Sequence, residues 1–331
     1  MPSRTRRRIL TLASIPASAA LALPTTSAFA QAYPAKAVRL IVPYPVGGGT
    51  DFFARTVGTK LGELLGQPVI VENKPGAATI IGAQSAATSP PDGYTVLVAD
   101  STTLAVNPSL YKKLGYDPVK DFSPVTLTAR FAMLLVVNPT RTKVSTVKEF
   151  IEEARKEQGN TSYASVGAGT THHLTMELFQ QRTGIKLNHV PYKGAGPAIQ
   201  DVAGGQVPVM FVDLAAGSPM IKAGKMRVLG VASPNRIAAL PDVPTLAEQG
   251  IAQFEAWAWQ GLVVPAGTPK DIIATLGTQY ARAVADPGVR QKLIEAGVEP
   301  ITSSPEEMSS YIRSETAKWA QVIKEGDIRV E

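Results

Sequence analysis

The stretch Val38–Arg55, VRLIVPYPVGGGTDFFAR, decides the fold of this chain. A short apolar run over residues 38–42 stops at Pro43, and three consecutive glycines follow at residues 47–49. From Thr50 onward, apolar residues recur at the spacing of one helix face. This order predicts a β-strand, a glycine-rich turn and an α-helix.

The turn itself, residues 43–51 and hereafter the first loop, is suited to a small anion. Glycines allow backbone N–H groups to approach a guest, and the start of a helix favours negative charge. The loop lacks the lysine of a phosphate-binding P-loop and the G-x-G-x-x-G spacing of a dinucleotide site. Two interpretations stay open from this segment alone: an anion site, or an ordinary strand–helix turn with Thr50 as its N-cap.

The N-terminus predicts export. Arginines at residues 4–8 precede a mostly apolar stretch over residues 9–23, and Ala28-Phe29-Ala30 then matches an A-x-A cleavage pattern. These features predict a signal peptide over residues 1–30 and a periplasmic protein, by the Sec or the twin-arginine route. The chain contains no cysteine, which excludes disulfides and a lipid anchor on cysteine.

Charge and length narrow the class further. Cleavage after Ala30 would leave 29 basic and 27 acidic residues, so the net charge of +6 falls to +2. No stripe of Lys and Arg with interleaved aromatic residues indicates nucleic-acid binding. After the signal, no apolar run approaches the roughly 20 residues of a membrane span. A remainder of about 300 residues favours two domains.

Downstream, short β-branched runs alternate with helical stretches, which predicts an α/β architecture with largely parallel sheets. The expected strands are residues 38–42, 69–71, 95–98, 134–137, 162–165, 187–190, 207–211, 226–231 and 261–264, and the expected helices are residues 50–65, 146–157, 172–182, 197–204, 269–285, 288–296 and 305–324.

The glycine-rich turn recurs. A second loop, residues 165–171, contains VGAGTT, and a third, residues 190–196, contains PYKGAG. Ligands of open α/β sheets bind at the carboxyl ends of strands. Because the first and second loops lie more than 100 residues apart, we expect two domains whose helix starts face one cleft. A small carboxylate would suit that cleft.

The chain resembles the Bug/TctC-type periplasmic solute-binding receptors of tripartite tricarboxylate transporters. The resemblance implies a two-lobed Venus-flytrap fold, with each lobe a mainly parallel sheet flanked by helices. It places lobe 1 at residues 33–131 plus 254–331 and lobe 2 at residues 132–253. The matching segments follow in order through the mature chain: PYPVGGGTDFFAR, VIVENKPGAATIIGA, PDGYTVL, NPSLYKKLGYDPVKDFSPVTL, SVGAGTTHHLTMELF, VPYKGAGPAIQDVAGGQV, IKAGKMRVLGV, LPDVPTLAEQG, WQGLVVPAGTP and PEEMSSYIRSETAKW.

The resemblance also implies a function. It predicts a monomeric receptor, not an enzyme, that captures a small carboxylate and delivers it to an integral-membrane permease without a cofactor. The ligand would be held largely by backbone amides and hydroxyls of the first and second loops. The residues that this carries over are Tyr44, Val46, Gly47, Gly48 and Thr50 in the first loop and Ser165, Gly169, Thr170 and Thr171 in the second.

Two acidic residues near the loops have structural explanations as well. Asp51 falls in the first turn of a helix and can pair with Arg55 at i, i+4, which favours a structural role. Asp213 follows an apolar strand, where it would accept a hydrogen bond from a ligand or cap the next helix. We include Asp213 among the ligand-binding candidates and leave both roles open.

The histidines do not indicate a metal site. His172 and His173 are adjacent and point to different sides of a helix, whereas metal-binding pairs usually stand at i, i+4. The chain has one further histidine, His189. His172 lies at a loop–helix junction, so we include it as a ligand-binding candidate beside the alternative of a plain helix-start residue.

The alternative function is a periplasmic α/β hydrolase or dehydrogenase that acts on a carboxylate. No nucleophile–base pairing, metal set or dinucleotide fingerprint is recognisable in the sequence, so no catalytic residue is assigned. The receptor is therefore the favoured prediction, with the identity of the carboxylate left open.

Overall fold

A computed structural model describes Met1 and residues 33–157 and 159–330. The predicted signal peptide, residues 1–30, lies outside these residues apart from Met1. Tyr33–Glu331 form one compact unit, and the fold described below is that of this unit alone.

The unit is built on a ten-stranded sheet. Eight strands follow the order β2-β1-β3-β9-β4-β7-β5-β6, while β8 and β10 also pair with β4. The strands are β1 (Val38–Val42), β2 (Val69–Asn73), β3 (Thr95–Asp100), β4 (Phe122–Val137), β5 (Ser162–Ser165), β6 (Asn188–Pro191), β7 (Val209–Asp213), β8 (Arg227–Val231), β9 (Trp257–Pro265) and β10 (Val298–Pro300).

Strand β4 joins two sets of strands. Its residues 122–132 pair with β9, and β10 pairs within the same stretch; together with β1, β2 and β3 these form the first strand set. Its residues 133–137 pair with β7 and β8, which with β5 and β6 form the second strand set. Two strand sets that share one strand give the two-lobed α/β fold predicted from the sequence. The lobe boundaries near residues 131 and 253 stay a prediction.

The sheet differs from the expected parallel one in its middle. The pairs β1–β2, β1–β3, β5–β6 and β5–β7 are parallel, but every pair that involves β4 or β9 is antiparallel. The reason is the chain path: β4 leads from the first strand set to the second, and β9 runs back beside it. Two neighbouring strands that lead out and back must run in opposite directions.

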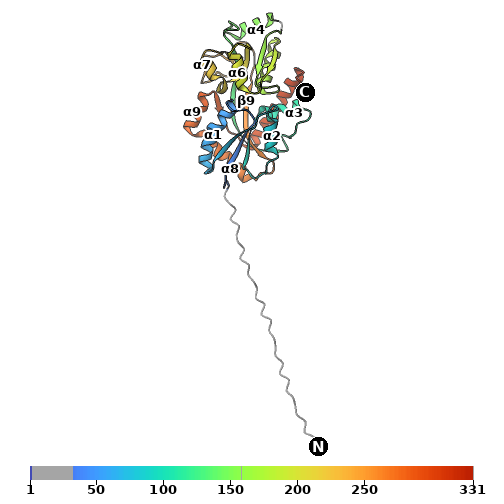
Figure 1. Cartoon of the computed structure of the whole chain (residues 1–331), viewed down its shortest axis with the longest axis vertical. Coiled ribbons are helices and arrows are strands. Elements are labelled where there is room, and N and C mark those ends of the chain that lie inside the picture. Colours follow the sequence, from blue (N-terminus) through green and yellow to red (C-terminus); the bar gives the residue numbers. More distant parts are fainter. Residues whose placement is uncertain (2–32, 158, 331) are drawn as a thin grey trace. The chain divides into compact units, whose positions relative to one another are not determined.

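The helices cover both strand sets. Figure 1 shows α4, α6 and α7 at one end of the unit, α1, α2 and α8 at the other, and β9 between them. The helices are α1 (Gly49–Leu65), α2 (Ile80–Ala87), the π-helix η1 (Thr102–Val106), α3 (Asn107–Leu110), α4 (Val147–Lys156), α5 (Thr171–Thr183), α6 (Ala195–Ala203), α7 (Leu214–Lys222), α8 (Lys270–Ala285), α9 (Pro287–Glu295) and α10 (Pro305–Glu325).

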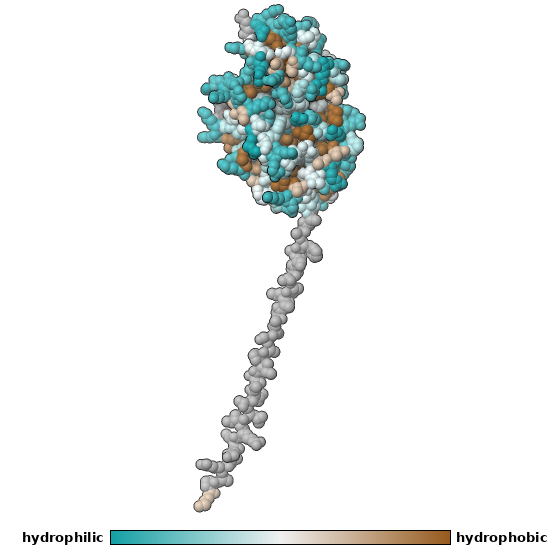
Figure 2. All heavy atoms as spheres, turned by 180° about the vertical axis from the view of Figure 1, so that it is seen from behind, coloured by the Kyte–Doolittle hydropathy of each residue, from teal (hydrophilic) through white to brown (hydrophobic). Residues whose placement is uncertain are grey.

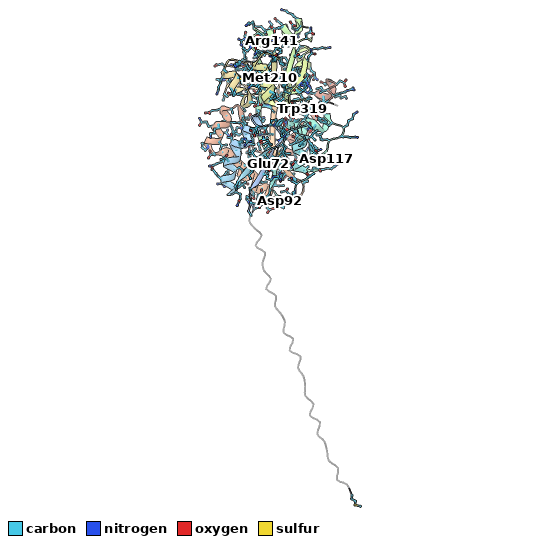
Figure 3. The ribbon with its side chains drawn as sticks, in the orientation of Figure 1. Glu72, Asp92, Asp117, Arg141, Met210 and Trp319 are labelled. Carbon is cyan, nitrogen blue, oxygen red and sulfur yellow. The ribbon has the colours of Figure 1, made fainter. Side chains whose placement is uncertain are left out.

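The C-terminal helix α10 packs where the two strand sets meet. Trp319 is fully buried, and in Figure 3 it lies between Met210 on one side and Glu72 on the other. An amide of α5 reaches this helix, since Gln181 Nε2 donates to the Val322 carbonyl at 3.1 Å. The last helix of the chain therefore contacts elements of both halves of the sheet.

The surface carries no single large apolar face in the view of Figure 2, where hydrophilic residues separate small apolar patches. Among the residues that the structure describes, no helix combines the length and hydropathy that a bilayer crossing requires. The exposed large apolar side chains in residues 33–330 are scattered: Val46, Ile70, Ile81, Val119 and Ile294.

Candidate ligand-binding site

A cavity of about 110 Å³ lies beside β4 and β9, at the starts of several helices. Its walls come from both strand sets. It is lined by Tyr44, Pro45, Val46, Gly48, Gly49, Thr50, Asp100, Phe131, Val166, Thr171, His172, Lys193, Gly194, Ala195, Gly196, Pro197, Asp213, Ala258, Trp259 and Gln260.

In the first loop, α1 begins one residue earlier than the sequence suggests. The N-cap is Gly48, which has no side chain and so makes no capping hydrogen bond. The suggestion that Thr50 caps this helix is therefore wrong. The Gly48 carbonyl instead accepts from the N–H of Phe52 at 3.0 Å. Because no side chain caps α1, its first N–H groups are left for another acceptor.

Asp51 has the structural role that the sequence favoured. Its buried carboxylate accepts from the Gly47 N–H at 3.0 Å, from Arg55 Nε at 3.0 Å and from Asn73 Nδ2 at 2.9 Å. Burial alone would raise the pKa of this carboxyl, but the hydrogen bonds from Arg55 and Gly47 hold it below its ordinary value. Asp51 therefore stays ionised and shapes the first loop rather than facing the cavity.

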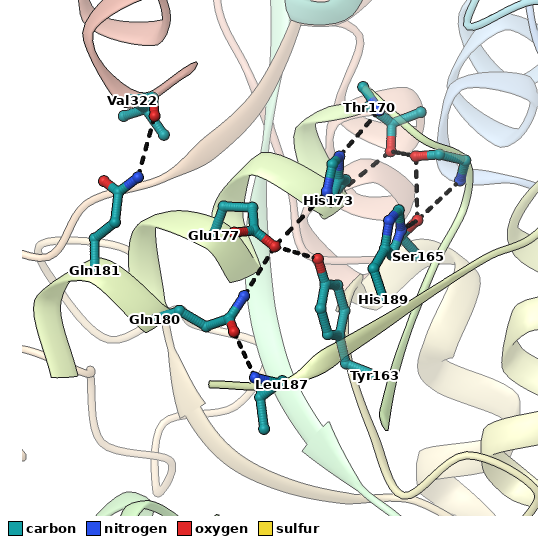
Figure 4. A network of polar contacts seen from close by, with 12 residues as sticks. Tyr163, Ser165, Thr170, His173, Glu177, Gln180, Gln181, Leu187, His189 and Val322 are labelled. Carbon is teal, nitrogen blue, oxygen red and sulfur yellow. Dashed lines mark hydrogen bonds and ion pairs between the residues drawn. The ribbon is translucent and has the colours of Figure 1, made fainter. Parts of the chain in front are cut away.

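The second loop is bonded to the residues that directly follow β3. The Thr171 N–H donates to Thr102 Oγ1 at 3.3 Å, and the hydroxyls of Thr171 and Ser101 share a hydrogen bond at 2.5 Å. Thr170 is the N-cap of α5, where its hydroxyl donates to the Gly167 carbonyl at 2.8 Å (Figure 4). The start of α5 is thus held directly against the end of β3.

Four helix starts meet at the cavity. They belong to α1 at Gly48, α5 at Thr171, α6 at residues 194–197 and α7 at Asp213. The sequence identified the third loop as a recurrence of the glycine turn but assigned it no ligand contact. Since the positive ends of helix dipoles and their free N–H groups favour anions, this arrangement suits a negatively charged group.

Asp213 turns out to be a helix cap that also faces the cavity. Its Oδ1 accepts from the Ala216 N–H at 2.9 Å, and its Oδ2 lies 3.5 Å from Nε2 of His172. A Cβ atom added at Gly49 would lie 2.5 Å from Asp213 Oδ1, so this carboxylate touches the start of α1. Capping by Oδ1 is the observed role, Oδ2 faces the imidazole of His172, and a ligand contact stays a prediction.

Gln260 is one of the lining residues that sequence analysis missed. It is 1% exposed, and neither its Nε2 nor its Oε1 has a hydrogen-bond partner in the described structure. It sits on β9 opposite Asp100 of β3. A glutamine inside the apolar run WAWQGLVV was the one available signal, because a polar residue in a buried strand needs a partner.

The predicted site residues fall into two groups. Gly47, Ser165, Gly169 and Thr170 do not line this cavity; Thr170 borders a neighbouring one. The predicted residues that the structure brings together on the cavity wall are Tyr44, Val46, Gly48, Thr50, Thr171, His172 and Asp213.

The remaining residues of the second loop rest on stacked aromatic rings (Figure 4). Ser165 Oγ lies 2.6 Å from His189 Nε2, and the rings of His189 and His173 stack with centroids 3.9 Å apart. The Gly169 N–H donates to His173 Nδ1 at 3.0 Å. Burial lowers the pKa of His173 to about 3, aided by His189, and that of His189 to about 4. Two neutral imidazoles therefore pack against the second loop and hydrogen-bond to it through Ser165 and Gly169.

Ser165 and His189 form a hydroxyl–imidazole pair that the sequence did not reveal. The pair does not make a reaction centre, because Ser165 is fully buried and does not line the cavity. In the part of the chain that the structure describes, no group of three or more His, Cys, Asp or Glu side chains is placed to hold a metal ion.

Comparison with known proteins identifies the family. Residues 53–328 match the tripartite tricarboxylate transporter family receptor, TctC. The chain belongs to this family. The chain is also similar to the solved structure of the periplasmic binding protein BugD, with 32% identity, a TM-score of 0.85, and coverage of 90% of this chain and 100% of BugD.

Two further solved structures of similar proteins carry ligands. Rpa4515 of R. palustris, solved with adipate, is 36% identical, with a TM-score of 0.87 over 90% of this chain and 99% of that one. MatC of Rhodopseudomonas palustris, solved with malate, is 31% identical, with a TM-score of 0.82 over 88% and 100%. TctC proteins and these neighbours are periplasmic solute-binding receptors, not enzymes, which removes the hydrolase or dehydrogenase alternative.

Proposed function

We propose that this TctC-family protein is a periplasmic receptor that captures a small carboxylate between its two lobes and delivers it to an integral-membrane permease. One observation carries the proposal: four helix starts, from both strand sets, converge on one cavity. The adipate and malate bound by similar proteins support the carboxylate class.

The cavity recognises charge through the backbone. Its one Lys, Lys193, is exposed, so the buried part of the wall offers helix N–H groups, hydroxyls and an imidazole to an anion. Asp100 is already satisfied, because its carboxylate accepts from Tyr44 Oη at 2.6 Å and from Thr103 Oγ1 at 2.7 Å. Backbone donors at helix ends are suited to a carboxylate because each supplies a directed hydrogen bond without a counter-charge that must be desolvated.

The proposed receptor also has a defined lobe division, oligomeric state and location. Lobe 1 would comprise residues 33–131 plus 254–331 and lobe 2 residues 132–253, with the ligand between them. The receptor would work as a monomer in the periplasm after cleavage behind Ala30, without a cofactor and without binding nucleic acid.

The direct test is a thermal-shift screen followed by calorimetry on the mature protein. Adipate, malate and other small carboxylates are compared with neutral analogues of the same length, such as adipamide and hexane-1,6-diol. A true ligand at 100 times its Kd should add about 2.7 kcal/mol to the free energy of unfolding. The proposal fails if no carboxylate raises the melting temperature, or if the neutral analogues raise it equally.

Delivery and location need tests in cells. Fractionation should recover the protein from the periplasm, with a mature N-terminus at Gln31. Deletion of the gene should abolish uptake of the carboxylate identified in the screen. Retained Met1 in the exported protein, or unchanged uptake, would contradict these parts of the proposal.

A further inference from the structure

Unpartnered polar atoms gather on the wall of the cavity. In residues 33–330, apart from residue 158, six buried side-chain nitrogen or oxygen atoms have no hydrogen-bond partner. Four of the six are the two ring nitrogens of His172 and the two amide atoms of Gln260. Both residues line the same cavity, and Gln260 is 99% buried, with a relative exposure of 1%.

The protein around Gln260 offers its amide no partner. Gln260 stands opposite Asp100 on β3 and Ala129 on β4. The Asp100 carboxylate is engaged by Tyr44 and Thr103, and alanine has no polar side-chain atom. Burying an amide without a hydrogen bond is unfavourable, so buried polar groups in native proteins nearly always have a partner. A polar group that enters the cavity would supply the missing partner.

We propose that Gln260 makes the receptor selective for carboxylates whose other end carries a hydroxyl or a carboxamide, over carboxylates of the same size with an apolar end. This inference rests on the proposed function and names its ligand class. The Gln260 amide presents both a donor and an acceptor, and the imidazole of His172, which lines the same cavity, has two ring nitrogens that can donate or accept. A group that both donates and accepts satisfies these side chains.

The charge beside His172 favours a neutral polar end. Asp213 Oδ2 lies 3.5 Å from His172 Nε2, so a further ionised group on the ligand would meet an existing carboxylate. An ionised carboxylate also only accepts hydrogen bonds and would leave Gln260 Oε1 without a donor. A methyl group would leave both amide atoms unpartnered, which is the arrangement that polar binding sites discriminate against most strongly.

The experiment uses pairs of ligands that differ by one group. The polar members are 4-hydroxybutanoate and succinamate, and their partners, pentanoate and 4-oxopentanoate, carry a methyl group in place of OH or NH₂. Pentanoate ends in an apolar group, whereas 4-oxopentanoate keeps a carbonyl acceptor and loses only the donor. Two longer pairs built in the same way, 6-hydroxyhexanoate with heptanoate and adipamate with 6-oxoheptanoate, extend the panel. By calorimetry on the mature protein, the polar member of at least one pair should bind about tenfold or more tightly.

The variant Gln260→Met separates ligand recognition from a structural role. Methionine has a similar length and no amide, so the preference within the pairs should fall to threefold or less. The melting temperature without ligand should stay the same or rise, because an unpartnered buried amide is removed. Gln260→Leu serves as a second variant if the methionine protein is poorly folded. Gln181→Met is the matched control: its amide is bonded to Val322 outside the cavity, so it should lower stability and leave the preference unchanged.

The outcomes are distinct. Equal affinities within every pair in the wild type, or a preference that survives both Gln260 variants, would overturn the role of Gln260 while the carboxylate receptor stands. If no carboxylate of any kind binds, the proposed function itself is wrong, and the ligand class assigned here falls with it.

Discussion

Glu315 of α10 has a buried carboxylate that accepts hydrogen bonds from two tryptophans. Its Oε2 accepts from Trp259 Nε1 at 2.8 Å and from Trp319 Nε1 at 3.1 Å, and the residue is 8% exposed. Trp259 belongs to β9 and lines the cavity, whereas Trp319 lies on the C-terminal helix. One side chain thereby fixes a cavity wall to the helix that packs behind it.

We expect Glu315→Ala to lower the free energy of unfolding by about 1–3 kcal/mol, because two buried indole N–H groups lose their acceptor. Glu315→Gln retains one acceptor oxygen and should cost less. Urea denaturation measures both. Lys318→Ala is the control, since its partly exposed ammonium pairs with the same carboxylate at 3.3 Å and a pair of this kind contributes little. Equal losses for Glu315→Ala and Lys318→Ala would contradict the explanation.

Single residues were also where the sequence was least informative. The glycines and hydroxyls of the first loop were recognisable because their chemistry and their order predict a helix start. Gln260 was not, because a strand buried on both faces does not reveal which side chain meets a cavity. For Asp213 the sequence allowed a cap or a ligand contact, and only the structure shows one side chain capping α7 while it faces the cavity.

At the scale of an element, α5 depends on the neutral state of two histidines. The ring of His173 accepts from the Gly169 N–H, and the ring of His189 stacks beneath it at 3.9 Å. Tyr163 and Glu177 complete the surroundings: the Tyr163 hydroxyl donates to Glu177 Oε1, and His173 Nε2 lies 3.7 Å from the same oxygen (Figure 4). A proton on His173 Nδ1 would remove the acceptor of the Gly169 N–H.

Stability should therefore fall as the solution is acidified. Both histidines have a pKa below the ordinary value of about 6.5, at about 3 for His173 and about 4 for His189, so the unfolded chain binds more protons below pH 6.5. Stability is complete above that pH and is lost as the pH falls toward 4, by up to about 1.4 kcal/mol per pH unit for each histidine. Urea midpoints at pH 7 and pH 5 measure the loss.

The control for this pH dependence is His189→Gln, which removes one of the two titrating rings. Burial raises the pKa of Glu177, so that residue acts in the opposite direction and is unchanged in the variant. The difference in stability between pH 7 and pH 5 should be smaller in His189→Gln than in the wild type. An identical difference in both proteins would show that other groups cause the loss.

Secondary structure was predictable where a pattern was long or sharply bounded. Strands β1 and β5 have the bounds expected from their β-branched runs, and α1 and α10 differ from the expected bounds by one residue at one end. Short elements were missed: α2 is mostly small residues, and α7 contains Pro219 within its nine residues. The antiparallel pairing of β4 and β9 was missed because it depends on the path of the whole chain rather than on local sequence.

On the scale of the whole molecule, contacts beside the cavity join elements of the two strand sets. Thr171 of α5 is bonded to Thr102 and Ser101, which follow β3, and Gly49 of α1 lies against Asp213. A ligand that contacts both sides favours this arrangement over an open one.

The division into two lobes was predictable from the spacing of the loops, whereas the boundaries came from the resemblance to TctC receptors.

Ligand binding should reduce the radius of gyration of the mature protein in X-ray scattering, because closure brings the two strand sets together. The measurement compares ligand-free protein with protein at a saturating concentration of the carboxylate found in the screen. A radius that does not change at saturation would contradict closure of the lobes.

Gly49→Ala should block this closure. The added Cβ would lie 2.5 Å from Asp213 Oδ1, an atom fixed by its hydrogen bond to Ala216, while alanine itself favours the helix that Gly49 begins. We expect at least a tenfold loss of affinity, no loss of melting temperature without ligand, and little change in radius when ligand is added. Gly58→Ala, in the same helix, is the control, since its Cβ would make an ordinary contact at 3.5 Å with Val69. Wild-type affinity in Gly49→Ala would show that the two sides need not approach so closely.

Because β9 lies between β3 and β4, the two strand sets can be completed only in a certain order as the chain is synthesised. The second strand set and its β4 partner are continuous from residue 133 to residue 231, so this half has all its strands before the chain is complete. The first set cannot close until residues 257–265 arrive, and until then β3 and β4 each present an edge without its neighbour. Unpaired edges of this kind are prone to association with other chains. While the chain is being made, the first strand set therefore keeps unpaired edges for longer than the second.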